Sequence, residues 1–180
     1  MKRDLLPGEY AVLGLLSLRP MHGYEMARYF DRDDLSEVCP LDQGLLYTYL
    51  RNVEERGLVS WQEMRVGLRP PRKLYQLTPA GRLSIDTWLR TPVGRMREVR
   101  LDLLLKLYFL RQAGGQGELA LLERQIAICE EYRDALGRRA AALDGFQRLV
   151  ATSKLSAAAS TIEWLRAYAA EVGAQARGVR

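Results

Sequence analysis

Two adjacent prolines, Pro70 and Pro71, constrain the fold of this chain more than any other feature. Proline has no backbone N–H, so neither residue can donate to the hydrogen-bond ladder of a β-sheet. On either side lie two short segments typical of strands: residues 58–64, which alternate, and residues 73–77, which read KLYQL. The sequence therefore predicts a β-hairpin whose tip is a loop over residues 65–73.

The predicted hairpin tip is basic. No acidic residue occurs from 65 to 73, a stretch that holds Arg65, Arg69, Arg72 and Lys73. Such a cluster is attracted to the phosphates of nucleic acid. A basic loop can also serve solubility alone, and this simpler interpretation stays open.

An amphipathic helix is predicted directly before the hairpin, over residues 42–56. Asp42 is the expected N-cap, because its carboxylate can accept from an unpaired backbone N–H. Gly57 lies where a C-cap glycine is common. At about 100° per residue, the apolar side chains on one face, which is predicted to be buried, are Leu46, Tyr49, Leu50 and Val53.

The opposite face of this helix is suited to reading DNA, although an ordinary solvated surface helix has a similar pattern. The Gln43 amide matches the edge of adenine, and Gly44 lets backbone approach a phosphate. A helix followed by a basic hairpin is typical of a winged helix-turn-helix, with the helix in the major groove and the wing on phosphates or in the adjacent minor groove. The predicted contacts on the helix and wing are Gln43, Gly44, Thr48, Arg51, Arg69, Arg72 and Lys73.

Composition sets broad limits on the class of protein. The chain has 180 residues and a net charge of +5, too small an excess to identify a nucleic-acid binder by itself. Cys39 and Cys129 are far apart and lack a metal-type spacing, so both are expected to be reduced thiols. The first residues do not resemble a signal peptide, and no apolar run approaches the roughly 20 residues of a bilayer span. We therefore expect a cytoplasmic protein without a membrane segment.

The remaining N-terminal residues predict short helices. Residues 7–18, 23–32 and 79–90 have helical spacing, whereas the polar residues 31–37 are expected to form a loop. His22, the only histidine, lies at the start of the second helix, where we expect it to cap the helix or contact a phosphate.

The C-terminal half predicts long helices. Residues 98–112 are apolar nearly all round. After the glycine-rich turn at 114–117, one long helix is expected up to about residue 150, and a last helix is expected over residues 157–176. Long apolar stripes of this kind need another helix to cover them from water, so dimerisation through these helices is expected. Packing of the helices within one chain is the alternative. The predicted fold class is mostly α with a small β-hairpin: an N-terminal winged helix-turn-helix over residues 1–92 and a C-terminal long-helix dimerisation and effector domain over residues 93–180.

Three motifs, taken together and in this order, resemble the PadR family of bacterial transcriptional regulators. They are HGYE at 22–25, GLLY at 44–47 followed by GLV at 57–59, and RKLYQLTPAG at 72–81. The resemblance implies a homodimeric winged helix-turn-helix repressor whose C-terminal helices form the dimer arm, and which a small molecule usually inactivates.

The resemblance also suggests roles for single residues. Tyr24 matches a position near the DNA backbone, Tyr47 matches the tyrosine of the recognition helix, and Arg72 and Lys73 match the wing. Family members often have Ser-Pro-Gly-Thr where this chain has Asp-Gln-Gly-Leu at 42–45. Leucine has no hydroxyl, so base readout is expected to shift to Gln43 and Thr48.

The sequence thus predicts a regulator, most simply a repressor, that binds a pseudo-palindromic operator in double-stranded DNA as a homodimer. A winged-helix module that binds another protein, without sequence-specific DNA binding, is the alternative. An enzyme is disfavoured because catalytic, metal and phosphate-loop motifs are missing, and no cofactor is expected. An aromatic effector is expected to meet the following side chains, for which simple packing is the alternative: Trp88, Tyr108, Phe109, Trp164 and Tyr168.

Overall fold

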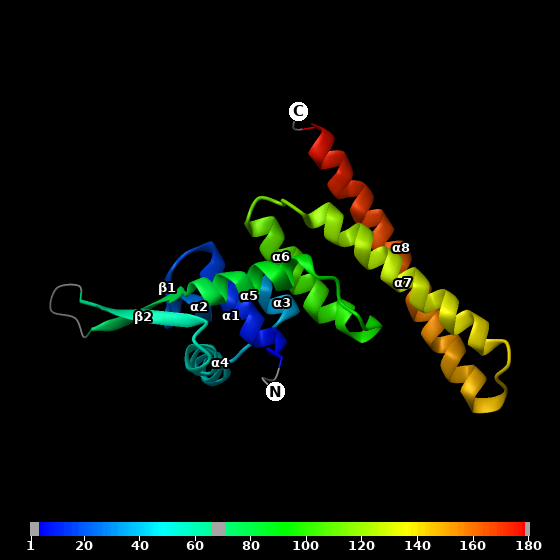
Figure 1. Cartoon of the computed structure of the whole chain (residues 1–180), viewed down its shortest axis with the longest axis horizontal. Helices are drawn as coiled ribbons and strands as arrows, with labels where there is room; N and C mark the ends of the chain where they lie inside the picture. Colours follow the sequence, from blue (N-terminus) through cyan, green and yellow to red (C-terminus); the bar gives the residue numbers. More distant parts are fainter. Residues whose placement is uncertain (1–3, 66–70, 179–180) are drawn as a thin grey trace. The chain divides into compact units, whose positions relative to one another are not determined.

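The structure, a computed structural model, describes residues 4–65 and 71–178, which form two compact units (Figure 1). Unit 1 comprises Met1–Thr91 together with Val99–Gly115, and unit 2 comprises Pro92–Glu98 together with Gln116–Arg180. The packing therefore groups residues 99–115 with the N-terminal unit, whereas the sequence placed the boundary at 92/93. The functional division of the chain at that boundary stays a prediction.

Unit 1 combines helices with a small antiparallel sheet. Its helices are α1 (Pro7–Leu18), α2 (Gly23–Arg32), α3 (Leu35–Val38), α4 (Gln43–Glu55), α5 (Pro79–Arg90) and α6 (Leu104–Gln112), the last preceded by a π-helical turn, Val99–Leu103. Its strands are β1 (Met21–His22), β2 (Val59–Met64) and β3 (Arg72–Leu77), in the order β1-β3-β2. This arrangement confirms a mostly α fold with a winged helix-turn-helix and a β-hairpin.

Helix α1 forms the centre of unit 1, in contact with α4, α5, α6 and β3. Its interior residues are almost wholly buried, because the sequence is apolar nearly all round: Ala11, Val12, Leu13, Leu15 and Leu16. Gly14 belongs to this set for a different reason, since a Cβ there would lie 2.3 Å from the Phe109 ring of α6. The absence of a side chain at position 14 is what lets α6 pack against α1.

Two features of unit 1 differ from the sequence prediction. The expected loop over residues 31–37 was wrong, because α3 begins at Leu35, whose apolar side chain is fully buried. Strand β1 was not predicted; it has only two residues, and its partners Tyr75 and Leu74 are remote in sequence. Both elements are stabilised by contacts that local periodicity does not report.

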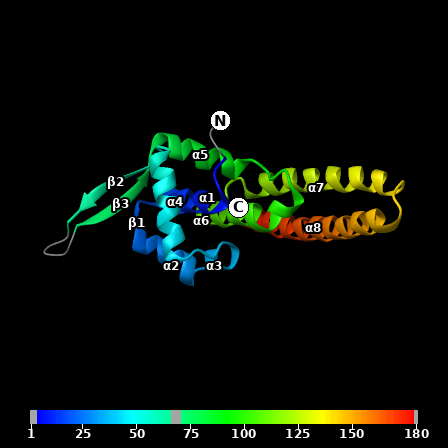
Figure 2. The ribbon, with the colours of Figure 1, turned by 90° about the horizontal axis from the view of Figure 1, so that it is seen from below.

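Unit 2 is a pair of long helices, α7 (Glu118–Ala140) and α8 (Gly145–Gly178), with a 3-10 turn at Met96–Glu98. Figure 2 shows the two helices lying side by side along their length, and they contact each other extensively. The predicted helix up to residue 150 was wrong: the chain turns at 141–144, and Gly145 has a left-handed φ of 46°. The alanines before the turn favour helix, which concealed the break from the sequence.

The buried residues of α7 and α8 include large side chains, Leu122, Ile162 and Leu165 among them, as well as small ones. Ala151 and Ala158 of α8 are buried, as is Cys129 of α7. Gln125, also buried, donates through Nε2 to the Val93 carbonyl and accepts from the Val93 N–H. Part of the apolar stripe is therefore covered within the chain, which was the alternative to dimerisation. None of the helices, over the ranges that the structure describes, is long and apolar enough to span a bilayer.

Candidate nucleic-acid interface

Helix α4 has the caps and the buried face that the sequence predicts. The carboxylate of Asp42 accepts from the Leu45 N–H at 2.8 Å, which satisfies one unpaired donor of the first turn. Gly57, just after the helix, has a φ of 71°. Leu46, Leu50 and Val53 are buried, whereas Tyr49, predicted for the same face, is half-buried, so one face of α4 is held in the core while the other is exposed.

A buried carboxylate fixes α4 to α1. Glu9 is fully buried, and its Oε1 accepts from Asn52 Nδ2 of α4 at 2.9 Å. Its Oε2 accepts from the Leu6 N–H at 2.8 Å and lies 4.0 Å from the Arg56 guanidinium. A buried charge is tolerated only when it is paired and hydrogen-bonded in this way. The orientation of α4 is thus set from its buried side, independently of its exposed residues.

The exposed face of α4 is mostly uncharged. Gln43, Gly44, Thr48 and Arg51 are all exposed, as predicted for residues that approach a ligand. Thr48 Oγ1 donates to the Gly44 carbonyl at 3.0 Å, so its hydroxyl proton is engaged within the helix. The remaining lone pairs of that oxygen can accept, which matches the exposed amino groups of adenine or cytosine.

A groove with a volume of about 660 Å³ brings together four of the predicted DNA-contacting residues. Residues from the start of α2, from α4 and from β3 line it: His22, Gly23, Tyr24, Tyr47, Arg72, Lys73 and Tyr75. Gly23 is required for this arrangement, because a Cβ there would lie 2.8 Å from the Tyr47 ring and hydroxyl. Tyr24 and Tyr47, which are distant in sequence, thus border the same groove as Arg72 and Lys73 of the wing.

The cations of the wing lie against aromatic rings. Arg72 Cζ is 5.1 Å from the centre of the Tyr24 ring, and Lys73 Nζ is 3.8 Å from the centre of the Trp61 ring. Trp61 Nε1 in turn donates to Glu54 Oε1 of α4 at 2.6 Å. Both cations belong to β3, paired with β2 at Met64↔Arg72 and Glu63↔Lys73, so the strand begins one residue earlier than predicted.

Sequence reasoning did not identify Trp61 as part of this site. It appeared only as one of the alternating residues of a strand, and its role depends on the register that sets it across from Tyr75. Arg69, the remaining wing residue among the predicted contacts, lies outside the described residues. The DNA contacts themselves stay predictions.

His22 joins α2 to the wing. It is the N-cap of α2, as predicted, and its backbone N–H donates to Glu25 Oε2 at 2.7 Å. Its ring Nδ1 lies 2.9 Å from the Lys73 carbonyl, and because a carbonyl only accepts, Nδ1 carries the proton. The ring also stacks on Tyr24, with centroids 5.5 Å apart.

Glu25 completes this corner of the site. Partial burial raises the pKa of its carboxyl, but the hydrogen bond from His22 and the Arg19 guanidinium outweigh burial and hold that pKa below its usual value. Arg19 Nη1 lies 3.2 Å from Glu25 Oε1. One carboxylate therefore fixes both the N-terminus of α2 and the residue that ends α1.

The aromatic residues predicted for an effector are divided between the units. In unit 1, Trp88 is buried and stacks on Tyr10 at 4.4 Å, and the Tyr108 hydroxyl donates to Asp33 at 2.7 Å. Phe109 is buried against α1, and its ring meets Tyr108 edge-on. These contacts give the three side chains a packing role, which was the alternative interpretation.

In unit 2, Trp164 is 41% exposed, and the Tyr168 hydroxyl donates to Glu118. An effector role for all five residues stays a prediction. Over residues 4–65 and 71–178, no His, Cys, Asp and Glu side chains gather into a group of three that could hold a metal ion. The buried Cys39 is not a reactive thiol, since burial raises its pKa to about 11.

Comparisons with known proteins extend over both units. Residues 12–87 match the profile of the transcriptional regulator PadR-like family, and residues 99–172 match that of the virulence activator alpha C-terminal family. The negative transcriptional regulator PadR of Bacillus subtilis strain 168 is 27% identical over 139 residues, covering 77% of this chain and 70% of that protein. The probable transcriptional regulator Rv1176c of Mycobacterium tuberculosis is 28% identical, covering 87% and 92%.

Among solved structures, that of Bacillus subtilis PadR in complex with operator DNA aligns over 94% of this chain and 99% of its own, with a TM-score of 0.49 and 22% identity. Its complex with p-coumaric acid aligns over 96% and 99%, with a TM-score of 0.42 and 21% identity. The HGYE, GLLY and RKLYQLTPAG motifs fall within the matched profile and build the groove described above. Over residues 12–87 the chain is therefore similar to the PadR-like family of transcriptional regulators.

Proposed function

We propose that this protein represses transcription by binding a pseudo-palindromic operator in double-stranded DNA as a homodimer. The observation that carries the proposal is the groove in which Tyr24, Tyr47, Arg72 and Lys73 converge beside the exposed face of α4. A groove bordered by hydroxyls and cations suits a sugar-phosphate backbone, and a capped helix with a mostly uncharged face suits base edges. The relative in Bacillus subtilis, named a negative transcriptional regulator, supports repression as the direction of control.

In the proposed complex, α4 enters the major groove. The Gln43 amide is placed to pair with adenine, and Thr48 Oγ accepts from an amino group of a base. Arg72 and Lys73 neutralise phosphates at the wing, while Tyr24 and Tyr47 donate hydroxyls to the backbone. The phosphate contacts supply affinity that depends on salt, and the side chains of α4 supply sequence preference.

The second copy is proposed to dock on unit 2. The α7–α8 pair covers only part of its apolar surface, and four large side chains remain exposed there: Tyr132, Phe146, Leu149 and Trp164. Burying them against a second copy would remove apolar surface from water. Two subunits related by a twofold axis then match half-sites about one helical turn apart, roughly 34 Å.

Two further statements belong to this proposal. We propose that the protein acts in the cytoplasm, where it would meet the DNA that it reads, and that it has no catalytic role. A small molecule is proposed to release it from the operator, and it can do so only if it binds the released conformation more tightly than the DNA-bound one.

The test is footprinting of the purified protein on the DNA upstream of its own gene, followed by titration of the protected duplex and a random duplex. We expect a twofold-symmetric footprint and a steep loss of affinity as salt rises. A protein-binding module would instead give no footprint and a nearly flat salt dependence. That result would reject the proposed function.

A further inference from the structure

The segment that links the two units is held by a buried side chain on each side. The chain first passes from unit 1 to unit 2 between Thr91 and Pro92. On the unit 1 side, Lys106 Nζ of α6 donates to the Thr91 carbonyl. On the unit 2 side, the Gln125 amide of α7 bonds both backbone groups of Val93. Residues 91–93 are therefore restrained from both units, and we call them the link.

The Lys106 ammonium is committed to the end of α5. Lys106 is only 3% exposed, so its charge must be compensated by protein groups. Its Nζ lies 4.7 Å from the centre of the Trp88 ring in addition to bonding Thr91. Thr91 is the C-cap of α5, and its Oγ1 donates to the Thr87 carbonyl at 2.8 Å. The last residue of unit 1 before the crossing is thus fixed to both α5 and α6.

Gln125 holds the first residues of unit 2. It is 1% exposed, its Oε1 accepts from the Val93 N–H at 2.8 Å, and its Nε2 donates to the Val93 carbonyl at 3.1 Å. Val93 is itself buried, so loss of the amide would leave two buried polar groups unsatisfied. Pro92, whose ring fixes φ, lies between the two restrained residues.

The other crossings between the units are built differently. The chain returns to unit 1 between residues 98 and 99, where a 3-10 turn is followed directly by a π-helical turn. It enters unit 2 again between residues 115 and 116, among three glycines with a left-handed φ: Gly114, Gly115 and Gly117. Glycine has more backbone freedom than any other residue. The crossing at the link, by contrast, is restrained by buried polar side chains.

A restrained link limits which pairs of half-sites a dimer can bind at the same time. In a dimer joined through unit 2, the distance between the two recognition helices depends on how each unit 1 is attached. A stiff attachment favours one distance, because binding both half-sites at once requires that the linkage can span them. We propose that Lys106 and Gln125 are specificity-determining residues that select the spacing between the two half-sites of the operator. The inference rests on the proposed function, in which α4 and the wing read each half-site.

The spacing role is tested with the full-length protein on three duplexes. They are the footprinted operator, the same operator with two base pairs inserted between its half-sites, and a single half-site. The insertion separates the half-sites by roughly 7 Å more and rotates them by roughly 70°. The wild type should bind the inserted duplex at least tenfold more weakly than the operator. A penalty below threefold in the wild type would overturn the proposal.

Two variants loosen the link, one from each unit. Lys106→Met and Gln125→Leu remove the polar groups and keep apolar side chains of similar size. Each should weaken operator binding several-fold, reduce the insertion penalty to below threefold, and leave affinity for the single half-site within twofold of the wild type. Parallel losses on all three duplexes, with the penalty intact, would show a structural role alone and overturn the proposal. Circular dichroism checks the fold, and because the variants alter different units, one stays informative if the other does not fold.

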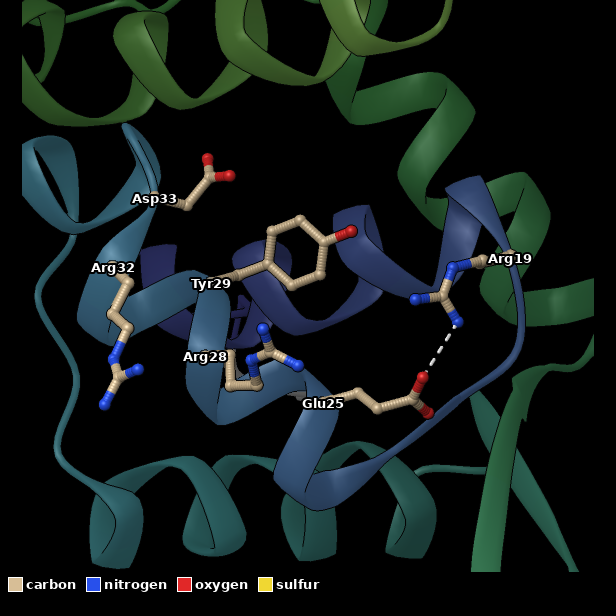
Figure 3. A pocket seen from close by; sticks show the side chains of 6 residues that line it. All are labelled: Arg19, Glu25, Arg28, Tyr29, Arg32 and Asp33. Atoms are coloured by element: carbon tan, nitrogen blue, oxygen red, sulfur yellow. Dashed lines mark hydrogen bonds and ion pairs between the residues drawn. The ribbon is translucent and has the colours of Figure 1, made fainter.

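Matched controls separate the link from charge and composition. Arg28 lies on α2 beside Tyr29 (Figure 3), and it belongs neither to the link nor to the lining of the groove. Arg28→Met removes one positive charge, as Lys106→Met does, but should keep the wild-type penalty. Gln112→Leu, at an exposed residue of α6, is the corresponding control for Gln125→Leu. Equal reduction of the penalty in a variant and its control would overturn the proposal.

Hydrogen exchange examines the link without DNA. The Val93 N–H, which is bonded to a buried amide, should exchange at least tenfold faster in Gln125→Leu than in the wild type, while amides of α1 keep their rates. Unchanged exchange at Val93 would overturn the proposal. A protein that leaves no footprint rejects the proposed function and the spacing role with it. A symmetric footprint with parallel losses on the three duplexes rejects the spacing role alone.

Discussion

Helix α4 and the β2–β3 wing both contribute residues to the groove, but α4 exposes mostly uncharged side chains and the wing exposes cations. The exposed face of α4 carries uncharged side chains such as Gln43 and Thr48, and the helix is fixed from its buried side by Glu9 and Asn52. The wing carries charge, and its cations rest on aromatic rings. The contrast suggests that sequence preference and affinity are supplied by two parts of the site that can be changed independently.

The two parts also differ in how their side chains are ordered before binding. On α4 the helix is anchored by its buried face, and the Gln43 side chain has no hydrogen bond to any described residue, whereas Thr48 Oγ1 already donates to the Gly44 carbonyl. On the wing, the Trp61 ring holds Lys73 Nζ at 3.8 Å, so less conformational entropy is lost when that cation meets a phosphate. Four experiments with substituted proteins test this contrast.

The largest effect is expected from removing both wing cations. Each charge-assisted contact contributes about 1.5–3 kcal/mol, so Arg72→Ala with Lys73→Ala should weaken binding roughly 100-fold or more on operator and random duplexes alike. The slope of log affinity against log salt should fall by about 2. Fluorescence-anisotropy titrations at several salt concentrations measure both quantities. A loss confined to the operator would contradict the assignment of affinity to the wing.

Gln43→Ala should act in the opposite manner. A bidentate contact to adenine contributes about 1–3 kcal/mol of discrimination, so operator binding should weaken roughly tenfold while binding to random DNA is unchanged. Single-base operator variants should show that the preference is lost at one position of each half-site. If random DNA binding falls equally, the two parts of the site are not separable.

Gly23→Ala tests how the groove itself is shaped. The added methyl would overlap the Tyr47 ring, which must move aside, because the new Cβ lies 2.8 Å from it. Since the displaced atoms are at the end of a side chain, we expect the midpoint of thermal unfolding to change little and DNA affinity to fall several-fold. Gly94→Ala, where the methyl would meet open space, is the control.

The smallest effect is expected at Trp61. Trp61→Phe keeps a ring beneath Lys73 but removes the hydrogen bond to Glu54, whereas Trp61→Ala removes both. A partly exposed cation–π contact contributes about 0.5–1 kcal/mol, so the alanine variant should bind a few-fold more weakly than the phenylalanine variant on every duplex. Identical affinities for the two variants would argue against prior ordering of the wing.

Elements defined by local signals were predicted well from the sequence. The spacing of apolar residues and the flanking prolines gave α1 and α2 with their observed ends, and Asp42 and Gly57 marked α4. These signals act within one helical turn, so they are visible in a single sequence. The wing was predicted for the same reason, because prolines and alternation are local features.

Features that depend on distant partners could not be predicted. Strand β1 exists only because Met21 pairs with Tyr75, and the function of Trp61 depends on Glu54 and Lys73. The turn at 141–144 was missed because alanines favour continuation of the helix, whereas packing of α8 on α7 favours reversal. Competition between local propensity and tertiary packing decides such positions.

The anchoring of α4 has a practical consequence for engineering. Since Leu46, Leu50, Val53 and Asn52 anchor this helix from its buried side, the exposed positions 43 and 48 can be varied with little effect on folding, whereas Tyr47 packs against Gly23 and lines the groove. Libraries randomised at these solvent-facing positions should yield regulators retargeted to new promoters without repair of the scaffold. The same domain is therefore suited to use as a DNA-binding module of exchangeable specificity in synthetic gene circuits.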